Sequence, residues 1–236
     1  MNGILAVALI ALWPTATLAD AGDGTPAQVV EWERIFAFLF LMLGPIKILG
    51  PFVAMTEGTD KPFRRRLATR AFLFSLAAVV IATSIGRRML TNLNIPLQVL
   101  ALTGGLILFL VALQQVLQQY TGPRGPVQAA PPTLALAFAP LAFPTIVTPY
   151  GVAAVIIFTA IAPDVTASGL VLGLVLLVLA LDWLAMLFAH TVVRWLGPML
   201  QLFGVVLGVT QVALGLQVIL RTLSTLGLFH LQGVSP

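Results

Sequence analysis

Long apolar stretches recur along this chain, separated by short polar interruptions. A helix of about 20 apolar residues is long enough to cross the hydrocarbon core of a bilayer. Six stretches meet this length, and they lie near residues 34–56, 68–86, 96–118, 133–161, 169–190 and 196–220. The pattern therefore predicts an all-α polytopic membrane protein with six transmembrane helices.

Composition supports the same class. The 236 residues are 59% hydrophobic and only 8% charged, with a mean hydropathy of +1.05, whereas a soluble domain is roughly 25% charged. A net charge of +4 would be compatible with nucleic-acid binding in a soluble protein. Here the basic residues cluster in a short loop between apolar stretches, so we expect them to orient the chain in the lipid bilayer, with no nucleic-acid partner.

The loop between the first two predicted spans, "TEGTDKPFRRRLATR", holds the densest basic cluster in the chain. The positive-inside rule assigns it to the cytoplasm. Alternation of the spans then predicts a cytoplasmic linker at 121–132 and periplasmic N- and C-termini. We expect a multi-pass protein of the bacterial inner membrane.

The first 19 residues resemble a signal peptide, because an apolar core ends in small residues before Asp20. No Lys or Arg precedes that core, and an uncleaved extra helix is the alternative. In either case, residues 20–33 are predicted to form a periplasmic segment.

The Gly- and Pro-rich linker 121–132 divides the spans into two sets of three, at residues 34–120 and 133–236. Because three is odd, the second set enters the membrane with the opposite orientation. If the two sets are related, they form an inverted repeat, the usual ancestry of secondary transporters. A pair of prolines in "PIKILGPF" of the first span recurs in "PTIVTPY" of the fourth span.

These prolines predict breaks in the first and fourth helices, because proline removes a backbone donor and clashes with the preceding turn. The first break is predicted to run from Gly44 to Gly50. In lipid, freed backbone groups are tolerated where they face protein or a water-filled cavity. We therefore expect the breaks to face each other as a polar midplane site, although two kinked packing helices would give the same pattern. The candidate substrate-binding residues are Gly44, Pro45, Lys47, Gly50, Pro51, Pro144, Thr145, Thr148, Pro149 and Tyr150.

Two ionisable side chains are predicted to lie deep in the bilayer: Lys47 in the first break, and Asp182 in the fifth span. Each costs about 2.5–3.5 kcal/mol by insertion scales, so each needs a partner inside the bundle. We expect the two to pair. Asp182 is then either a proton- or cation-sensitive coupling group or a structural counter-ion for Lys47.

Several functions are disfavoured by missing motifs. The chain has no cysteine, and its two histidines, His190 and His230, lie far apart, so we expect no metal site and no cofactor. No phosphate-binding loop, H-E-x-x-H or G-x-S-x-G motif occurs. We therefore expect no enzymatic activity, and any transport should be driven by a gradient.

Five segments together resemble the MarC family of bacterial integral membrane proteins, which includes small neutral amino acid transporters. They are "GPIKILGPF", "RRRLATRA", "LTGGLILFLVALQQVL", "PLAFPTIVTPYG" and "LGPMLQLFGVVLGVTQVALGLQVIL". The resemblance implies six helices in two inverted three-helix units, with the substrate site at the proline breaks. It also carries over the motif residues Pro45, Ile46, Pro51, Gly104, Gly105, Pro140, Pro144 and Pro149.

The sequence departs from the family at the breaks. The family typically begins its first break Asn-Pro or Asp-Pro, where this chain has Gly44-Pro45, and it has a glycine where Lys47 stands. The family's Gly-Pro-Gly-Ala in the fourth helix becomes "TPYG" at residues 148–151. These differences indicate a changed substrate, such as one with a carboxylate that pairs with Lys47, or a relative that has lost transport.

The leading hypothesis is a secondary transporter of a small, amino-acid-like metabolite, working by alternating access at the midplane site. The alternatives are a non-transporting membrane scaffold or assembly protein and a passive channel. The oligomeric state is not predicted.

Overall fold

The computed structural model describes residues 32–118 and 133–227, and these residues are helical with no strand among them. The predicted signal peptide, the linker 121–132 and the C-terminal tail beyond residue 227 lie outside the described residues. Six spans are present if the bent fourth span is counted as one. The all-α membrane fold is therefore confirmed.

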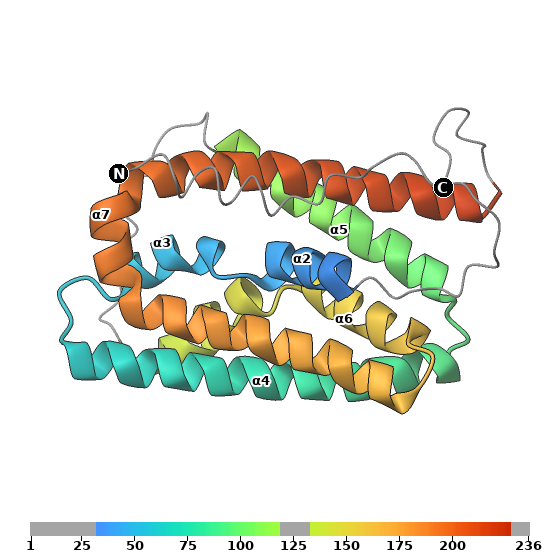
Figure 1. Ribbon diagram of the computed structural model, residues 1–236, viewed down its shortest axis with the longest axis horizontal. Coiled ribbons are helices and arrows are strands. Elements are labelled where there is room, and N and C mark those ends of the chain that lie inside the picture. The colour runs from blue at the N-terminus through green and yellow to red at the C-terminus, as the bar shows by residue number, and fades with distance from the viewer. Residues whose placement is uncertain (1–31, 119–132, 228–236) are drawn as a thin grey trace. The chain divides into compact units, whose positions relative to one another are not determined.

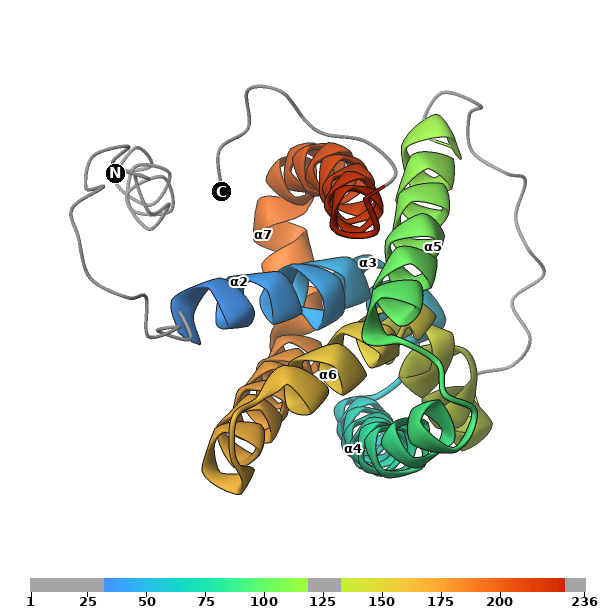
Figure 2. The ribbon, with the colours of Figure 1, turned by 90° about the vertical axis from the view of Figure 1, so that its right-hand side faces the viewer.

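The first span consists of two helices, α2 (Trp32–Leu43) and α3 (Ile46–Met55). It is the most buried of the five unbent candidate spans among the described residues, at 44% against 17–33% for the others. Leu39 and Phe52, one from each half, are fully buried. Figures 1 and 2 show α2 and α3 running through the middle of the bundle, with the other helices around them.

Two long helices follow, α4 (Lys61–Asn92) and α5 (Leu97–Gln118). Asp60 begins α4 as its N-cap, because its carboxylate accepts a hydrogen bond from the Phe63 amide at 3.2 Å. Exposed apolar side chains cover the outer faces of both helices, as expected for surfaces that contact lipid. Examples are Leu73, Phe74, Val80, Ile81, Leu106 and Leu110.

The fourth span starts with the short helices η1 (Leu134–Ala137) and η2 (Phe138–Ile146) and continues, after a bend of 62°, as α6 (Pro149–Ile161). The prolines explain this irregularity. A residue that precedes proline is pushed towards extended backbone, and Ala139, Phe143 and Thr148, which precede the three prolines, all have ψ between 126° and 151°. The predicted break in the fourth span is therefore present.

The last element, α7 (Val165–Thr225), contains both remaining spans without an intervening loop. It reverses direction near the end of the fifth span, so that its two halves run in opposite directions (Figure 1). The candidate spans are Val165–Leu200 and Leu202–Thr225, close to the predicted 169–190 and 196–220. We predicted two separate helices here, whereas the structure has one continuous helix that includes Pro198.

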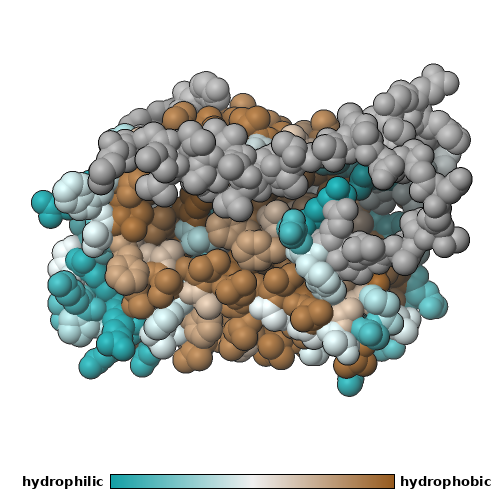
Figure 3. All heavy atoms as spheres, in the orientation of Figure 1, coloured by the Kyte–Doolittle hydropathy of each residue, from teal (hydrophilic) through white to brown (hydrophobic). Residues whose placement is uncertain are grey.

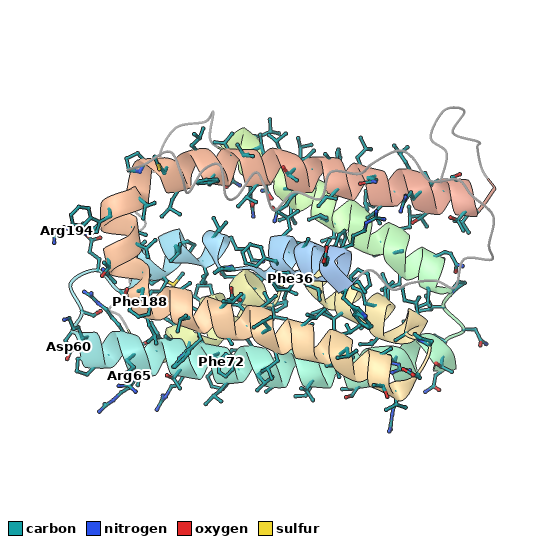
Figure 4. The ribbon with its side chains drawn as sticks, in the orientation of Figure 1. Phe36, Asp60, Arg65, Phe72, Phe188 and Arg194 are labelled. Atoms are coloured by element: carbon teal, nitrogen blue, oxygen red, sulfur yellow. The ribbon has the colours of Figure 1, made fainter. Side chains whose placement is uncertain are left out.

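Hydrophobic side chains form the middle of the face seen in Figure 3, and hydrophilic ones gather towards its two ends. The polar end at which α4 begins also carries Asp60, Arg65 and Arg194 (Figure 4). This distribution is the one that a bilayer-spanning bundle requires.

Candidate functional site

The first break exposes the carbonyl end of α2. The last four carbonyls of any helix have no partner inside it, and at Leu41 the expected donor four residues later is Pro45, which has no N–H. The Phe40 carbonyl accepts from the Gly44 amide at 2.8 Å. The Leu41 carbonyl accepts from the Gln211 side chain of α7 at 2.7 Å. The Met42 carbonyl accepts from the Lys47 ammonium group.

This break is shorter than we predicted. Residues Ile46–Met55 form a continuous helix, so the backbone opens at Gly44 and Pro45 and not through Gly50. Pro51 lies inside α3. A proline within a membrane helix removes one hydrogen bond without having to end the helix. At Gly44-Pro45 the proline follows a glycine, and the backbone there comes too close to Phe40 for any side chain. A Cβ at Gly44 would lie 1.9 Å from the Phe40 carbonyl oxygen.

The second break lies beside the first. The Thr148 hydroxyl, which is buried, caps α6 by accepting from the Gly151 amide at 3.1 Å. Next to it, the buried Tyr150 ring has its centroid 5.7 Å from the Lys47 ammonium nitrogen. Lys47 therefore contacts the carbonyl end of one broken helix and the ring of Tyr150 in the other. The carbonyl oxygen and the face of the ring both favour a cation.

Asp182 on α7 is 1% exposed, and neither of its carboxylate oxygens has a hydrogen-bond partner among the described residues. Lys47 and Asp182 interact electrostatically. The structure thus brings the two charged residues into one region, but the ammonium group is bonded to Met42 and not to the carboxylate. The direct ion pair that we expected is not formed in this conformation.

A cavity of about 490 Å³ adjoins the first break, and we call it the lysine cavity. Gly44, Lys47, Gly50 and Pro51 from the predicted site line it. Its other walls come from α2, α3, α5 and the stretch of α7 around its change of direction, and include Phe40, Gln115, Gly197, Gly204, Gly208 and Gln211. These segments place it in the half of the bundle where α3 ends and α4 begins.

A second cavity, of about 350 Å³, lies in the opposite half, and we call it the arginine cavity. It lies among the start of α2, the start of α5, α6 and the end of α7, with lining residues that include Arg34, Met42, Ala101, Tyr150, Phe158 and Arg221. Met42 and Tyr150, which line this cavity, are the two residues that Lys47 contacts from the lysine cavity. The two cavities therefore meet at Lys47, Met42 and Tyr150.

Some predicted residues are not brought to either cavity. Pro45, Pro144, Thr145, Thr148 and Pro149 are absent from both linings, and the side chains of Pro144 and Pro149 are exposed on the bundle surface. Thr148 acts as a helix cap. The second break contributes to the site mainly through Tyr150.

Three cavity residues were not among the predicted site residues: Gln211 in the lysine cavity, and Arg34 and Arg221 in the arginine cavity. A signal for Gln211 existed: the carbonyl four residues before Pro45 needs a donor from elsewhere. The sequence does not say which helix supplies that donor.

Comparison of the sequence with known proteins identifies its family. The model of the MarC family of integral membrane proteins matches residues 30–226, which include every described helix, from Trp32 to Thr225. The chain belongs to the MarC family. This confirms the resemblance drawn from the five sequence segments.

Three similar proteins are named UPF0056 membrane or inner membrane proteins. A UPF0056 membrane protein of Methanocaldococcus jannaschii is 27% identical over 189 residues, or 79% of this chain and 92% of the relative. A UPF0056 membrane protein of Archaeoglobus fulgidus is 26% identical over 165 residues, or 69% of this chain and 77% of the relative. The UPF0056 inner membrane protein YhgN of Escherichia coli is 25% identical over 111 residues, or 47% of this chain and 55% of the relative. No solved structure matches the chain.

Proposed function

We propose that this MarC-family protein is a secondary transporter that moves a small metabolite by alternating access. The observation that supports this most directly is the pair of cavities in opposite halves of the bundle, which meet at Lys47, Met42 and Tyr150. In an alternating-access transporter, a site near the midplane opens to each side of the membrane in turn, and broken helices supply its binding groups. The two broken spans contact each other here, through Lys47 of the first span and Tyr150 of the fourth.

The lysine cavity favours a small polar substrate. Its volume of about 490 Å³ falls within the range of roughly 300–1,000 Å³ that is usual for small-molecule sites. Lys47, Gln115 and Gln211 offer hydrogen-bonding groups, while Gly50 and Gly204, where a Cβ would meet nothing within 4 Å, leave room for a ligand near the backbone. An amino-acid-like metabolite whose carboxylate interacts with Lys47 is the substrate that we propose, with no enzymatic step.

The orientation follows from charge. Lys61, Arg65 and Arg66 lie at the beginning of α4, in the half that holds the lysine cavity. On the basis of the positive-inside rule, we propose that this end faces the cytoplasm and that both termini are periplasmic. The relative YhgN is named an inner membrane protein, and we propose the inner membrane for this chain. We also propose that residues 34–120 and 133–236 are inverted repeats, because the first and fourth spans are both broken.

Transport can be tested with the purified protein in proteoliposomes. A mixture of labelled amino acids is offered under an imposed proton or sodium gradient, and uptake is normalised to the folded protein. We expect saturable accumulation that changes when Lys47→Gly is introduced and is unchanged by Lys61→Ala, a control at an exposed position. Absence of any gradient-driven flux would leave a membrane scaffold as the better interpretation, and flux that does not saturate would indicate a channel.

A further inference from the structure

The carbonyl end of α2 has the properties of a cation site. A helix C-terminus carries a partial negative charge of about half an electron, and it favours cations most strongly where water is scarce. Met42 is only 3% exposed, and its carbonyl oxygen is one of the terminal carbonyls left without a partner inside α2. In membrane transporters, such carbonyls at broken helices can coordinate Na⁺.

Asp182 contributes the negative charge that such a site lacks. Its carboxylate is buried and has no hydrogen-bond partner among the described residues, a state that is costly unless a cation or a proton accompanies it. Carboxylate and carbonyl oxygens together are the ligands that hard cations prefer. The ammonium group of Lys47 is a positive charge that acts on Asp182 in this structure.

We propose that the Lys47 ammonium group is a built-in substitute for a free alkali cation at the carbonyl end of α2. In the native chain, its contacts with the Met42 carbonyl and the Tyr150 ring fill the cation position, so Na⁺ does not bind there. When the side chain is removed, the Met42 carbonyl and Asp182 keep their negative potential. Lys47 forms part of the wall of the lysine cavity, so the space that its side chain leaves opens onto that cavity and admits a hydrated ion. Shortening Lys47 should therefore create a sodium site.

This inference does not depend on transport, and it can be tested on the purified protein in detergent. Thermal unfolding is followed in sodium chloride and in choline chloride at equal ionic strength. For Lys47→Ala, a tenfold excess of Na⁺ over its dissociation constant should raise the melting temperature by roughly 3–5 °C. The native protein and the exposed-site control Lys61→Ala should show no sodium-specific shift.

A second variant identifies the ligand. In Lys47→Ala/Asp182→Asn the carboxylate charge is gone, and the sodium-specific shift should disappear. The proposal is overturned if Lys47→Ala melts at the same temperature in both salts, if pH replaces sodium as the variable that stabilises it, or if the shift persists in the double variant. If Lys47→Ala cannot be purified in choline chloride, recovery in sodium chloride supports the proposal, and failure in both salts overturns it.

Discussion

At the scale of single residues, the first break is held by donors that replace missing helix hydrogen bonds. Three consecutive carbonyls, those of Phe40, Leu41 and Met42, have three different kinds of partner. One partner comes from a distant helix, because Gln211 lies 170 residues along the chain from Leu41. Specific donors therefore satisfy the carbonyls that the break exposes. The contribution of each donor to stability can be tested separately.

Gln211→Leu should destabilise the protein. It removes the donor to the partly buried Leu41 carbonyl, and the loss of this hydrogen bond should cost about 1 kcal/mol. The measurement is thermal or denaturant unfolding in detergent. The matched control is Gln217→Leu, the same substitution on the same helix at an exposed position, which should have little effect. Equal losses in both variants would show that the Leu41 contact contributes nothing.

Gly44→Ala should be more harmful than Gly50→Ala, although both glycines line the lysine cavity. A Cβ at Gly44 would overlap the Phe40 carbonyl oxygen at 1.9 Å, whereas a Cβ at Gly50 meets nothing within 4 Å. Forcing the backbone apart should cost at least about 1–3 kcal/mol. At Gly50, alanine should be neutral or slightly stabilising, because alanine has a higher helix propensity than glycine. Unfolding of the two variants side by side checks this, and a Gly44→Ala protein as stable as Gly50→Ala would contradict it.

At the scale of elements, α5 and the second half of α7 approach each other closely. A Cβ at Gly215 would lie 2.6 Å from the Phe109 amide nitrogen, and one at Gly105 would lie 2.8 Å from a methyl group of Val218. Small residues allow membrane helices to approach closely, and their contacts replace the hydrophobic effect as the source of association. The sequence motif of glycines four apart is less informative, since Gly169 and Gly173 have nothing within 4 Å.

Gly215→Ala should therefore weaken the α5–α7 contact. The neighbouring atoms are backbone atoms of Phe109, which cannot move aside as the end of a side chain could. We expect a loss of about 1–3 kcal/mol, measured as a lower melting temperature. Gly173→Ala, on the same helix, is the control and should not lower it. If the two variants melt together, the close approach at Gly215 is not important for stability.

Hydropathy and proline were sufficient to predict the spans and the existence of both breaks, because each is a local property of the chain. They were not sufficient for the extent of the first break, where Pro51 remains helical. Nor did they predict that Lys47 contacts the Met42 carbonyl, or that α7 continues through Pro198. The cavities could not be predicted either. Their walls combine segments more than 100 residues apart, such as Gly44 and Gly204, and the sequence alone does not say which helices are neighbours.

At the scale of the whole molecule, the arrangement of the two cavities makes a prediction about access from each side. The chain has no cysteine, so a single introduced thiol is labelled without background. Ala101 lines the arginine cavity and Gly204 lines the lysine cavity, where a Cβ would meet nothing within 4 Å. Leu106 is 48% exposed on α5 and serves as a lipid-facing control.

We expect membrane-impermeant thiol reagents to label Ala101→Cys from the periplasmic side and Gly204→Cys from the cytoplasmic side, and to leave Leu106→Cys unlabelled. Because alternating access opens one cavity as the other closes, an amino acid that is transported should change the two labelling rates in opposite directions. Oriented vesicles and mass spectrometry give both rates. Labelling of each thiol from both sides would mean a continuous pore, and rates that no amino acid in the mixture alters would count against alternating access for that class of substrate.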